Sequence, residues 1–167
     1  MHIGILSDTH GKTKRLKKVL EILARRQVDI VVHCGDIINP DDVTLLGAFA
    51  GQAYLVAGNM DRQNLPDLAR AARTAGVKFA EEFVNVPLKN KQKLAATHGH
   101  YEMLLDELIR GGQYAYVCHG HTHRSRDERY ESTRILNPGA LYHPKGTDRK
   151  TFVLLDTKTD TVEVLDV

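Results

Sequence analysis

The sequence predicts an α/β fold with a mixed sheet arrangement, in which two sheets pack face to face. Two observations lead to this prediction. In the first half of the chain, short apolar runs alternate with helical patterns, which is typical of parallel strands joined by right-handed crossovers. In the second half, apolar runs follow one another with short polar turns between them, which is typical of hairpins.

The first half predicts three strands, each followed by a helix. The strands cover residues 2–7, 29–34 and 52–56, and the helices cover about 13–27, 40–49 and 65–75. Asn39-Pro40 is typical of an N-cap followed by proline at the first helical position, so the second helix should begin there. Gly76 suits the left-handed residue that ends many helices, so the third helix should stop before it.

The second half predicts mostly strands. Their expected positions are 77–88, 93–99, 114–119, 130–137, 151–156 and 161–167. A turn at 89–91 should join the first two, and a polar turn at 157–160 should join the last two as a hairpin. One helix is expected at about 101–110, where Gly111-Gly112 stops it.

Length and composition limit the classes of protein to consider. The chain has 167 residues, of which 42% are hydrophobic and 26% charged, and it suits one domain over residues 1–167. A formal net charge of +2 makes no electrostatic case for nucleic acid or a membrane surface as a partner. The unusual feature is the content of nine histidines, so their positions matter most.

Cysteine usage and the first residues predict a cytoplasmic protein. Cys34 and Cys118 are far apart and form no CxxC pair, so we expect small buried thiols rather than a disulfide framework. Met1 leads into an apolar stretch that is too short for a signal sequence and has no basic segment before it. No apolar run approaches transmembrane length, so no membrane association is expected.

Polar residues gather where the predicted strands end. The first three strands run into SDTHG, CGDI and GNMD, and two later strands run into THGH and HGHTH. The carboxyl ends of parallel strands share one edge of a sheet, so these residues should converge there. The candidate metal ligands are Asp8, His10, Asp36, Asn59, His98, His121 and His123. Glycine stands beside four of them, Asp36, Asn59, His98 and His121, where it permits tight turns and close approach to a ligand.

The residue types and their spacing point to a divalent metal. Aspartate, histidine and an amide oxygen are ligands for borderline ions such as Mn, Fe, Zn or Ni, and the absence of cysteine disfavours structural zinc. Asp8/His10 and His121/His123 are spaced i, i+2, which in an extended strand end would point both side chains to one side. Taken singly, each fragment also fits an N-cap, a surface histidine or a plain turn. Their joint occurrence at strand ends favours a metal site.

These motifs resemble a known family. DTH at 8–10, GD at 35–36, GN at 58–59, HGH at 98–100 and GHTH at 120–123 are similar to the motifs of the calcineurin-like metallophosphoesterases. Length, spacing and NPGA at 137–140 resemble the small bacterial and archaeal phosphodiesterase branch, over essentially the whole chain. The resemblance implies an α/β fold of four layers, an αββα sandwich of two mixed β-sheets flanked by helices (the metallo-dependent phosphatase fold).

The resemblance also implies two divalent metal ions. Asp8, His10 and His123 would bind the first, Asn59, His98 and His121 the second, and Asp36 would bridge both. Mn is the first expectation, with Ni, Fe, Zn or Mg as alternatives. Two ions about 3.5–4 Å apart share a bridging water and lower its pKa, which supplies hydroxide for in-line attack on phosphorus. They also neutralise charge on the phosphoryl oxygens.

The implied function is a metal-dependent phosphodiesterase that acts on a small phosphoester. The alternative is a non-catalytic interaction scaffold, as in the retromer subunit of the same fold. All seven ligand positions hold competent residues, which favours the enzyme. No nucleic-acid-binding module is recognised, and the family's frequent dimers leave a homo-oligomer open. The sequence does not identify the natural substrate.

Two positions affect the expected mechanism. Met60 follows Asn59 where many superfamily members have a histidine that protonates the leaving group, so we expect a preference for good leaving groups. The amide of Asn59 should also lie near the phosphate. His100 lies at i, i+2 from His98 and is a candidate for contact with substrate, or for the missing acid. Asp61 is expected to support the turn rather than bind metal.

The remaining basic residues receive structural interpretations. We expect His2, His33 and His143 to be structural or surface residues, and His119 to pack near the site without binding metal. Lys12 and Lys14 belong to a basic run on the first helix that should face solvent, and either could help to hold a phosphate.

Overall fold

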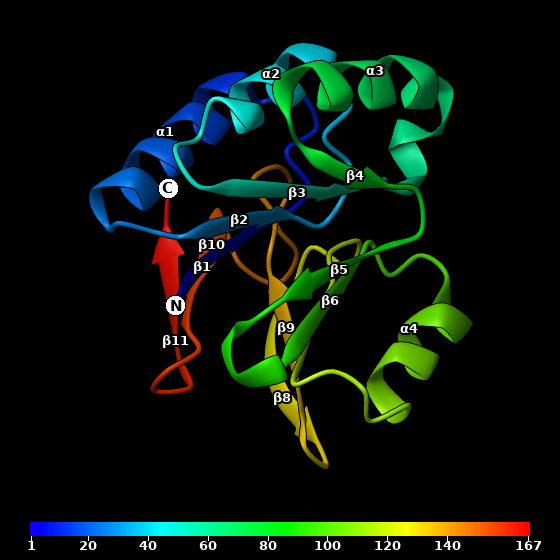
Figure 1. Cartoon of the computed structure of the whole chain (residues 1–167). Helices are drawn as coiled ribbons and strands as arrows, with labels where there is room; N and C mark the ends of the chain where they lie inside the picture. The colour runs from blue at the N-terminus through cyan, green and yellow to red at the C-terminus, as the bar shows by residue number, and fades with distance from the viewer.

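The computed structural model describes residues 1–167, with every side chain except that of Asn90. Its strands form two sheets, one above the other in Figure 1. The first sheet contains β1 (His2–Leu6), β2 (Ile30–His33), β3 (Gln52–Val56), β4 (Lys78–Ala80), β10 (Thr151–Asp156) and β11 (Thr161–Asp166). The second contains β5 (Phe83–Pro87), β6 (Lys93–Thr97), β7 (Tyr116–Cys118), β8 (Ser125–Tyr130) and β9 (Thr133–Pro138).

Helices cover the outer faces of both sheets (Figure 1). Over the first sheet lie α1 (Thr13–Arg25), α2 (Pro40–Gly47) and α3 (Leu65–Ala75), and beside the second lies α4 (Glu102–Arg110). Two short 3-10 helices, η1 (Asn59–Asn64) and η2 (Lys89–Lys91), occur in connections. The four layers confirm the predicted αββα sandwich.

Three groups of buried apolar side chains hold the layers together. The group between the three helices and the first sheet includes Leu6, Leu16, Val19, Leu46, Leu55, Leu68 and Phe152. The group between the sheets includes Ile3, Ile5, Val32, Tyr54, Val86, Leu94 and Leu136. The smallest joins α4 to the second sheet through Ala95, Leu108, Ile109, Val117 and Ile135. Burial of this apolar surface on both faces of each sheet is the main driving force for folding.

Strand order explains where a functional site can form. The first sheet runs β11-β10-β1-β2-β3-β4, and β1 to β4 pair in parallel. The second runs β5-β6-β7-β9-β8, with β6 parallel to β7 and β7 parallel to β9. Parallel strands end at a common edge, so the segments after β1, β2 and β3 are neighbours in space.

The predicted start of α2 and end of α3 are confirmed by the caps that the structure shows, whereas α1 ends at Arg25 and α2 at Gly47, each two residues earlier than predicted. The Asn39 side chain accepts a hydrogen bond from the Asp41 backbone N–H at 3.0 Å, and Pro40 begins α2. Gly76 has a φ of 73° and ends α3. Both hairpins also form as expected, β5 with β6 and β10 with β11.

One strand prediction of the second half is wrong, and another is correct only in part. Residues 77–88 do not form one strand, because β4 pairs in the first sheet and β5 in the second, with a bend at Glu81-Glu82 where the chain crosses between sheets. The strand predicted at 130–137 agrees with β9 over residues 133–137 but begins too early, before the turn at 131–132, and β8 was not predicted. An exposed edge strand such as β8, with sequence SRDERY, carries no alternation of apolar residues for a pattern to detect.

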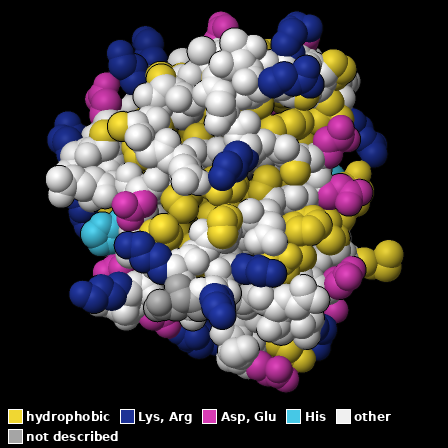
Figure 2. Space-filling model, in the orientation of Figure 1, with side chains coloured by type: hydrophobic (Ala, Val, Ile, Leu, Met, Phe, Trp, Pro, Cys, Tyr) yellow, Lys and Arg dark blue, Asp and Glu magenta, His cyan; other side chains and the backbone are white. Residues whose placement is uncertain are grey.

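The surface carries mixed charge. On the face shown in Figure 2, Lys and Arg side chains are scattered among Asp and Glu rather than gathered in one patch. No helix of the described chain is both long enough and apolar enough to cross a membrane. On this face, therefore, no single region of positive charge stands out as an anion-binding surface.

Candidate metal centre

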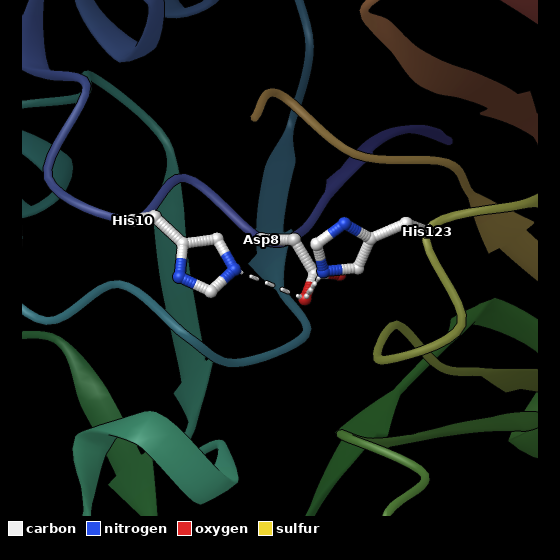
Figure 3. A group of neighbouring side chains, drawn as sticks. All are labelled: Asp8, His10 and His123. Atoms are coloured by element: carbon white, nitrogen blue, oxygen red, sulfur yellow. Dashed lines mark ion pairs between the residues drawn. The ribbon is translucent and has the colours of Figure 1, made fainter. Parts of the chain in front are cut away.

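The loops after five strands bring two groups of potential metal ligands together. Asp8, His10 and His123 form one group, whose ligand atoms all lie within 4.8 Å of one another. Figure 3 shows the rings of His10 and His123 directed toward the Asp8 carboxylate. His123 Nε2 is 3.1 Å and His10 Nε2 3.8 Å from Asp8 Oδ1. This is the set that the resemblance implied for the first ion.

Asp36 connects this group to a second one. Asp8, Asp36 and His98 also have ligand atoms within 4.8 Å of one another. Asp36 Oδ2 lies 3.6 Å from His10 Nε2 and 3.4 Å from His98 Nε2. The Oδ1 of Asn59 lies 3.0 Å from His98 Nε2. One carboxylate is therefore approached by imidazoles from both groups, which is the arrangement that a bridging ligand requires.

His121 and His100 lie at the margin of these groups. The ring of His121 is exposed and lies 5.1 Å from that of His98, and neither of the ligand groups found among the described side chains includes it. The His121 backbone N–H donates to Asp8 Oδ2 at 3.1 Å. The ring of His100 lies 5.4 Å from that of His98 and 4.0 Å from that of Tyr101. Both histidines thus border the Asn59–His98 side of the site.

The backbone that presents these residues is left-handed, not extended. Positive φ angles occur at five of the seven candidate ligands: Asp8 (54°), His10 (46°), Asp36 (57°), His121 (64°) and His123 (58°). The prediction that i, i+2 pairs sit on extended strand ends is therefore wrong, although Asp8 and His10 still converge. For residues with a side chain this conformation costs about 1–2 kcal/mol each. Such strain concentrates at functional sites, where the surrounding fold maintains it.

Two glycines allow the loops to pack directly against the carboxylates. A Cβ on Gly58 would lie 2.1 Å from Asp36 Oδ1, and one on Gly120 would lie 2.7 Å from Asp8 Oδ2. Any side chain at these positions would displace the carboxylate. The glycines beside the predicted ligands therefore serve close approach, as expected.

Hydrogen bonds orient the histidine rings toward the site. His98 Nδ1 lies 2.7 Å from the Cys34 carbonyl oxygen, and His123 Nδ1 lies 2.7 Å from the His143 carbonyl oxygen. A carbonyl can only accept, so Nδ1 carries the proton in both rings. Nε2 of each ring is left facing the carboxylates, as in histidines that bind metal through Nε2.

Charges within the site shift the pKa values of its members. Burial is the largest single influence and would lower the pKa of His98 and raise that of Asp36, but the close contact between the two side chains, together with other nearby charges and backbone hydrogen bonds, outweighs it, so the pKa of His98 is raised and that of Asp36 is lowered. The nearby Asp8 carboxylate, whose Oδ1 lies 3.1 Å from His123 Nε2, raises the pKa of His123. Burial lowers the pKa of His10. These contacts favour protonated imidazoles beside ionised carboxylates. A bound divalent cation would displace those protons, because imidazoles and carboxylates bind metal in their deprotonated forms.

The donor atoms fit a divalent cation. Asp8 Oδ1 and His10 Nε2 are buried and form no hydrogen bond with the described residues. Buried polar atoms without partners are costly, so atoms of this kind aimed into one site indicate a ligand. Carboxylate oxygen, imidazole nitrogen and amide oxygen together suit borderline divalent ions.

Asp61 organises the loops from behind. Its buried carboxylate accepts backbone N–H groups from Gly58 (2.8 Å), Asp36 (2.9 Å), Ile38 (2.7 Å) and, at 3.4 Å, Ile37. Burial raises the pKa of this carboxyl group, and the N–H donors oppose that rise. The carboxylate thus joins the loop that carries Asp36 to the loop that carries Asn59. This placement agrees with the supporting role predicted for Asp61.

The other histidines have the structural positions expected of them. His2 and His143 are exposed, and His119 is buried beside Asn137, whose amide nitrogen lies 3.2 Å from His119 Nδ1. Asn137, from the NPGA segment, also donates to the Gly120 carbonyl at 2.9 Å and so holds the GHTH loop in place. Cys34 and Cys118 are buried free thiols, as predicted.

His33 is completely buried and fixed as a neutral ring. Its Nδ1 accepts the Gly35 N–H at 3.2 Å, so Nε2–H donates to Thr9 Oγ1 at 2.7 Å. This contact ties the segment after β1 to the last residue of β2. Burial lowers the pKa of His33 from 6.5 to about 4.

We expect the metal-free protein to lose stability when the pH falls from 6.5 toward 4. The unfolded chain takes up the His33 proton near pH 6.5 and the folded chain only near pH 4, so the free energy of unfolding decreases across this window. The gap corresponds to about 3 kcal/mol. Urea titrations with a chelator at several pH values measure the slope. His33→Gln should reduce it and the exposed His2→Gln should not; equal slopes in all three proteins would contradict this assignment.

A basic and aromatic wall borders the first ligand group, and the sequence pattern did not reveal its aromatic part. Lys12 Nζ lies 4.5 Å from the centre of the Tyr142 ring, and that ring lies 5.5 Å from the ring of His10. Lys12 is exposed but is held beside the site by this cation–π contact, and Lys14 is exposed as well. Tyr142 comes from the loop after NPGA, far from Lys12 in sequence, so only the fold brings them together.

A four-layer αββα sandwich with a cluster of Asp, His and Asn at the carboxyl edge of its sheet defines a metallophosphoesterase. Comparison with known families agrees. Residues 1–160 match the family model of the calcineurin-like phosphoesterase superfamily domain. The chain therefore belongs to the calcineurin-like phosphoesterase superfamily. Membership of this family supports the conclusion that the protein is a metal-dependent phosphoesterase.

Individual relatives give the same assignment. The chain is 30% identical over 141 residues to a phosphodiesterase of Methanocaldococcus jannaschii, covering 83% of each protein. It is 27% identical over 179 residues to the phosphodiesterase YfcE of Escherichia coli, covering 99% of this chain and 93% of that protein. A solved archaeal phosphodiesterase superposes with a TM-score of 0.88 at 27% identity over all of both chains. Vps29 of Entamoeba histolytica shares the fold, at 18% identity and a TM-score of 0.70 over 100% of this chain and 99% of its own.

Proposed function

We propose that this protein is a phosphodiesterase with two divalent metal ions. The observation that supports this most directly is the position of Asp36, whose Oδ2 lies 3.6 Å from His10 Nε2 and 3.4 Å from His98 Nε2. A carboxylate between two sets of imidazoles suits a shared ligand. Relatives named as phosphodiesterases, at about 30% identity, support the choice of a diester as substrate.

The chain offers a distinct set of donors to each ion. Asp8, His10 and His123 would hold the first, Asn59, His98 and His121 the second, with Asp36 shared. His121 would join the second set by a rotation of its exposed ring. When bound, the two ions would lower the pKa of a water molecule between them and neutralise phosphate charge. Mn²⁺ is the first expectation, since carboxylate, amide and imidazole all suit it.

Side chains of the protein would position the phosphate. The Asn59 amide lies beside His98, and the Lys12 ammonium lies over the Tyr142 ring beside His10, so both can donate to phosphoryl oxygens. Burial lowers the pKa of His100, and the neighbouring charges of His98 and His121 lower it further. At neutral pH His100 is therefore a neutral ring that donates a hydrogen bond to substrate, rather than a strong acid.

A scaffold without activity is the second candidate, because Vps29 structures share the fold. That likeness is below 25% identity and concerns the fold alone. Burying Asp8 and Asp36 on a strained backbone costs folding energy, and a scaffold that does not bind metal would gain nothing in return. Metal binding separates the two candidates.

We expect about two Mn²⁺ ions to bind per chain. Protein treated with chelator, loaded with Mn²⁺ and freed of excess metal should contain this amount by elemental analysis, and its melting temperature should rise because ligands stabilise the folded state. It should then hydrolyse bis(p-nitrophenyl) phosphate. A panel of diesters and monoesters with Mn²⁺, Ni²⁺, Mg²⁺ and Zn²⁺ would define the reaction. Absence of bound metal after loading would contradict the proposal.

Met60 creates a specific expectation for the leaving group. Its side chain is 54% exposed and has no proton to donate, while its backbone N–H donates to Asp36 Oδ1 at 2.9 Å. Met60→His keeps that backbone contact and adds an imidazole beside Asn59. Hydrolysis of diphenyl phosphate, with its poor leaving group, should then increase about tenfold to a hundredfold relative to bis(p-nitrophenyl) phosphate.

The matched control is Met103→His, at an 88% exposed position on α4. Rates of both variants on the two diesters, with metal content measured in parallel, test the prediction. If Met60→His binds metal normally and its preference stays that of the parent protein, the absence of an acid at position 60 does not limit the reaction.

A further inference from the structure

A cavity of about 210 Å³ opens beside Asn59 and His100, at the border of the candidate metal centre. Its other principal lining residues are Ala57, Arg62, Leu65, Glu81, Glu82 and Tyr101. We call it the side cavity. Because Asn59 and His100 belong both to it and to the candidate metal centre, a substituent on a phosphate held at the centre can reach it. Its volume is below the roughly 300–1,000 Å³ of pockets for drug-sized molecules, so it suits one small group.

The polar groups of the side cavity are oppositely charged but not paired. Arg62 forms no ion pair with Glu81, Glu82 or any other carboxylate of the described residues; its hydrogen bond is with Tyr101 Oη, at 3.4 Å. Glu81 and Glu82 likewise have no cationic partner in the part of the chain that the structure describes. A ligand between them must therefore offer hydrogen-bond acceptors to the guanidinium and donors to the carboxylates.

The apolar and aromatic lining adds a requirement for shape. Ala57 and Leu65 are apolar, and the Tyr101 side chain is 42% exposed. An exposed tyrosine ring beside apolar residues is a surface on which a flat ring stacks. Aliphatic diesters would leave this surface and the carboxylates unused, whereas a heterocycle with polar edges uses both.

We infer that the side cavity binds the nucleobase of a nucleotide phosphodiester, with guanine preferred. Guanine presents acceptors at O6 and N7, which arginine recognises. Its N1–H and N2–H₂ groups are adjacent donors that a carboxylate accepts together. Adenine has only the N6 amino group as a donor on its ring edge. Arg62, the two glutamates and Tyr101 thus match guanine better than other bases. This inference depends on the proposed function, because the phosphate of the same molecule occupies the metal centre.

Competition between nucleotides tests the inference. Guanosine monophosphate, inosine monophosphate, adenosine monophosphate and ribose 5-phosphate are used as inhibitors of bis(p-nitrophenyl) phosphate hydrolysis with Mn²⁺. All share a phosphate, so differences in inhibition constant report on the base. We expect the guanine nucleotide to inhibit at least tenfold better than ribose 5-phosphate, and inosine monophosphate, which lacks N2–H₂, to be intermediate. Equal inhibition by guanosine and adenosine monophosphates, or by guanosine monophosphate and ribose 5-phosphate, would overturn the inference.

Variants locate the effect. Glu81→Gln/Glu82→Gln retains side-chain size but replaces carboxylate acceptors by amides, and should abolish the advantage of the guanine nucleotide over ribose 5-phosphate. Glu21→Gln/Glu107→Gln, at exposed positions on α1 and α4, changes charge equally and should retain it. A retained advantage in the first double variant would overturn the assignment to the glutamates.

Failure of the phosphodiesterase proposal gives a different result. In that case bis(p-nitrophenyl) phosphate is not hydrolysed at all. Calorimetric titration of metal-free protein with guanosine monophosphate and ribose 5-phosphate still measures their affinity for the side cavity. Tighter binding of the guanine nucleotide, lost in Tyr101→Ala, would support the cavity assignment even then, and equal binding of the two would refute it.

Discussion

Asp36→Asn is expected to reduce kcat/KM for bis(p-nitrophenyl) phosphate by roughly a thousandfold or more, which corresponds to about 4 kcal/mol. The carboxylate is within 3.6 Å of His10 Nε2 and 3.4 Å of His98 Nε2, so one substitution weakens the donor sets of both proposed ions. Asparagine is nearly the same size and can still accept the Met60 N–H that now bonds to Asp36 Oδ1. The loss should therefore arise from charge and metal affinity, not from unfolding.

Steady-state kinetics and elemental analysis of the same preparation measure this effect. Asp148→Asn removes an exposed carboxylate from the loop before β10 and serves as the matched control, with unchanged rate and metal content. Circular dichroism verifies that Asp36→Asn remains folded. Turnover within tenfold of the parent protein, with both ions bound, would show that Asp36 is not a shared ligand.

Asp61→Asn should have the largest effect on stability. The carboxylate accepts backbone N–H groups from Gly58, Asp36, Ile37 and Ile38, and an amide can accept with only one of its two polar atoms. Buried donors left without a partner cost about 1–3 kcal/mol. We expect a loss of about 3 kcal/mol, which lowers the melting temperature of a chain of this size by roughly 6–12 °C.

The fold provides a control of the same residue type. Asp42 is also completely buried, but neither carboxylate oxygen forms a hydrogen bond of normal geometry with the described residues, and burial raises the pKa of its carboxyl group. Asp42→Asn removes an unpaired buried charge, so it should leave the melting temperature unchanged or raise it. Thermal unfolding of both variants in chelator makes the comparison. Similar destabilisation by the two substitutions would mean that the four N–H contacts of Asp61 contribute no more than burial itself.

Asp61→Asn should also weaken metal binding, by about tenfold to a hundredfold. The reason is that the Asp61 carboxylate orients the two loops that carry Asp36 and Asn59. Mn²⁺ titration of the folded variant measures this at a temperature well below its unfolding transition. An unchanged affinity would restrict Asp61 to a role in stability.

The sequence predicted the fold class well where patterns are local. Helical periodicity, Asn39-Pro40 and Gly76 placed α1, α2 and α3 within a few residues of their observed ends. The prediction failed where the arrangement of strands in the two sheets, rather than a local pattern, determines the structure. The chain from Val77 to Leu88 is apolar enough for one long strand, but Glu81-Glu82 is where it leaves one sheet for the other. Nothing in a local pattern records which sheet a strand joins.

By itself, the sequence determined which residues can bind metal, because ligand chemistry belongs to side-chain types and their order in the chain. It identified Asp8, Asp36 and the five motifs DTH, GD, GN, HGH and GHTH as candidate ligand positions. It also showed that Met60 stands where many superfamily members have an acid. The tertiary structure decided how those residues are presented: on left-handed backbone at Asp8, His10, Asp36, His121 and His123 rather than on extended strand ends.

The tertiary structure also decided what surrounds the metal centre. Arg62, Glu82 and Tyr101 come from three segments whose sequences show no common pattern, and they share a cavity only because the β4–β5 crossover and the start of α4 meet beside η1. Lys12 and Tyr142 are 130 positions apart and lie in contact. Long-range contacts of this kind depend on the packing of whole layers, whereas ligand identity depends on single residues. This is why the sequence predicts the chemistry of the site but not the residues that surround it.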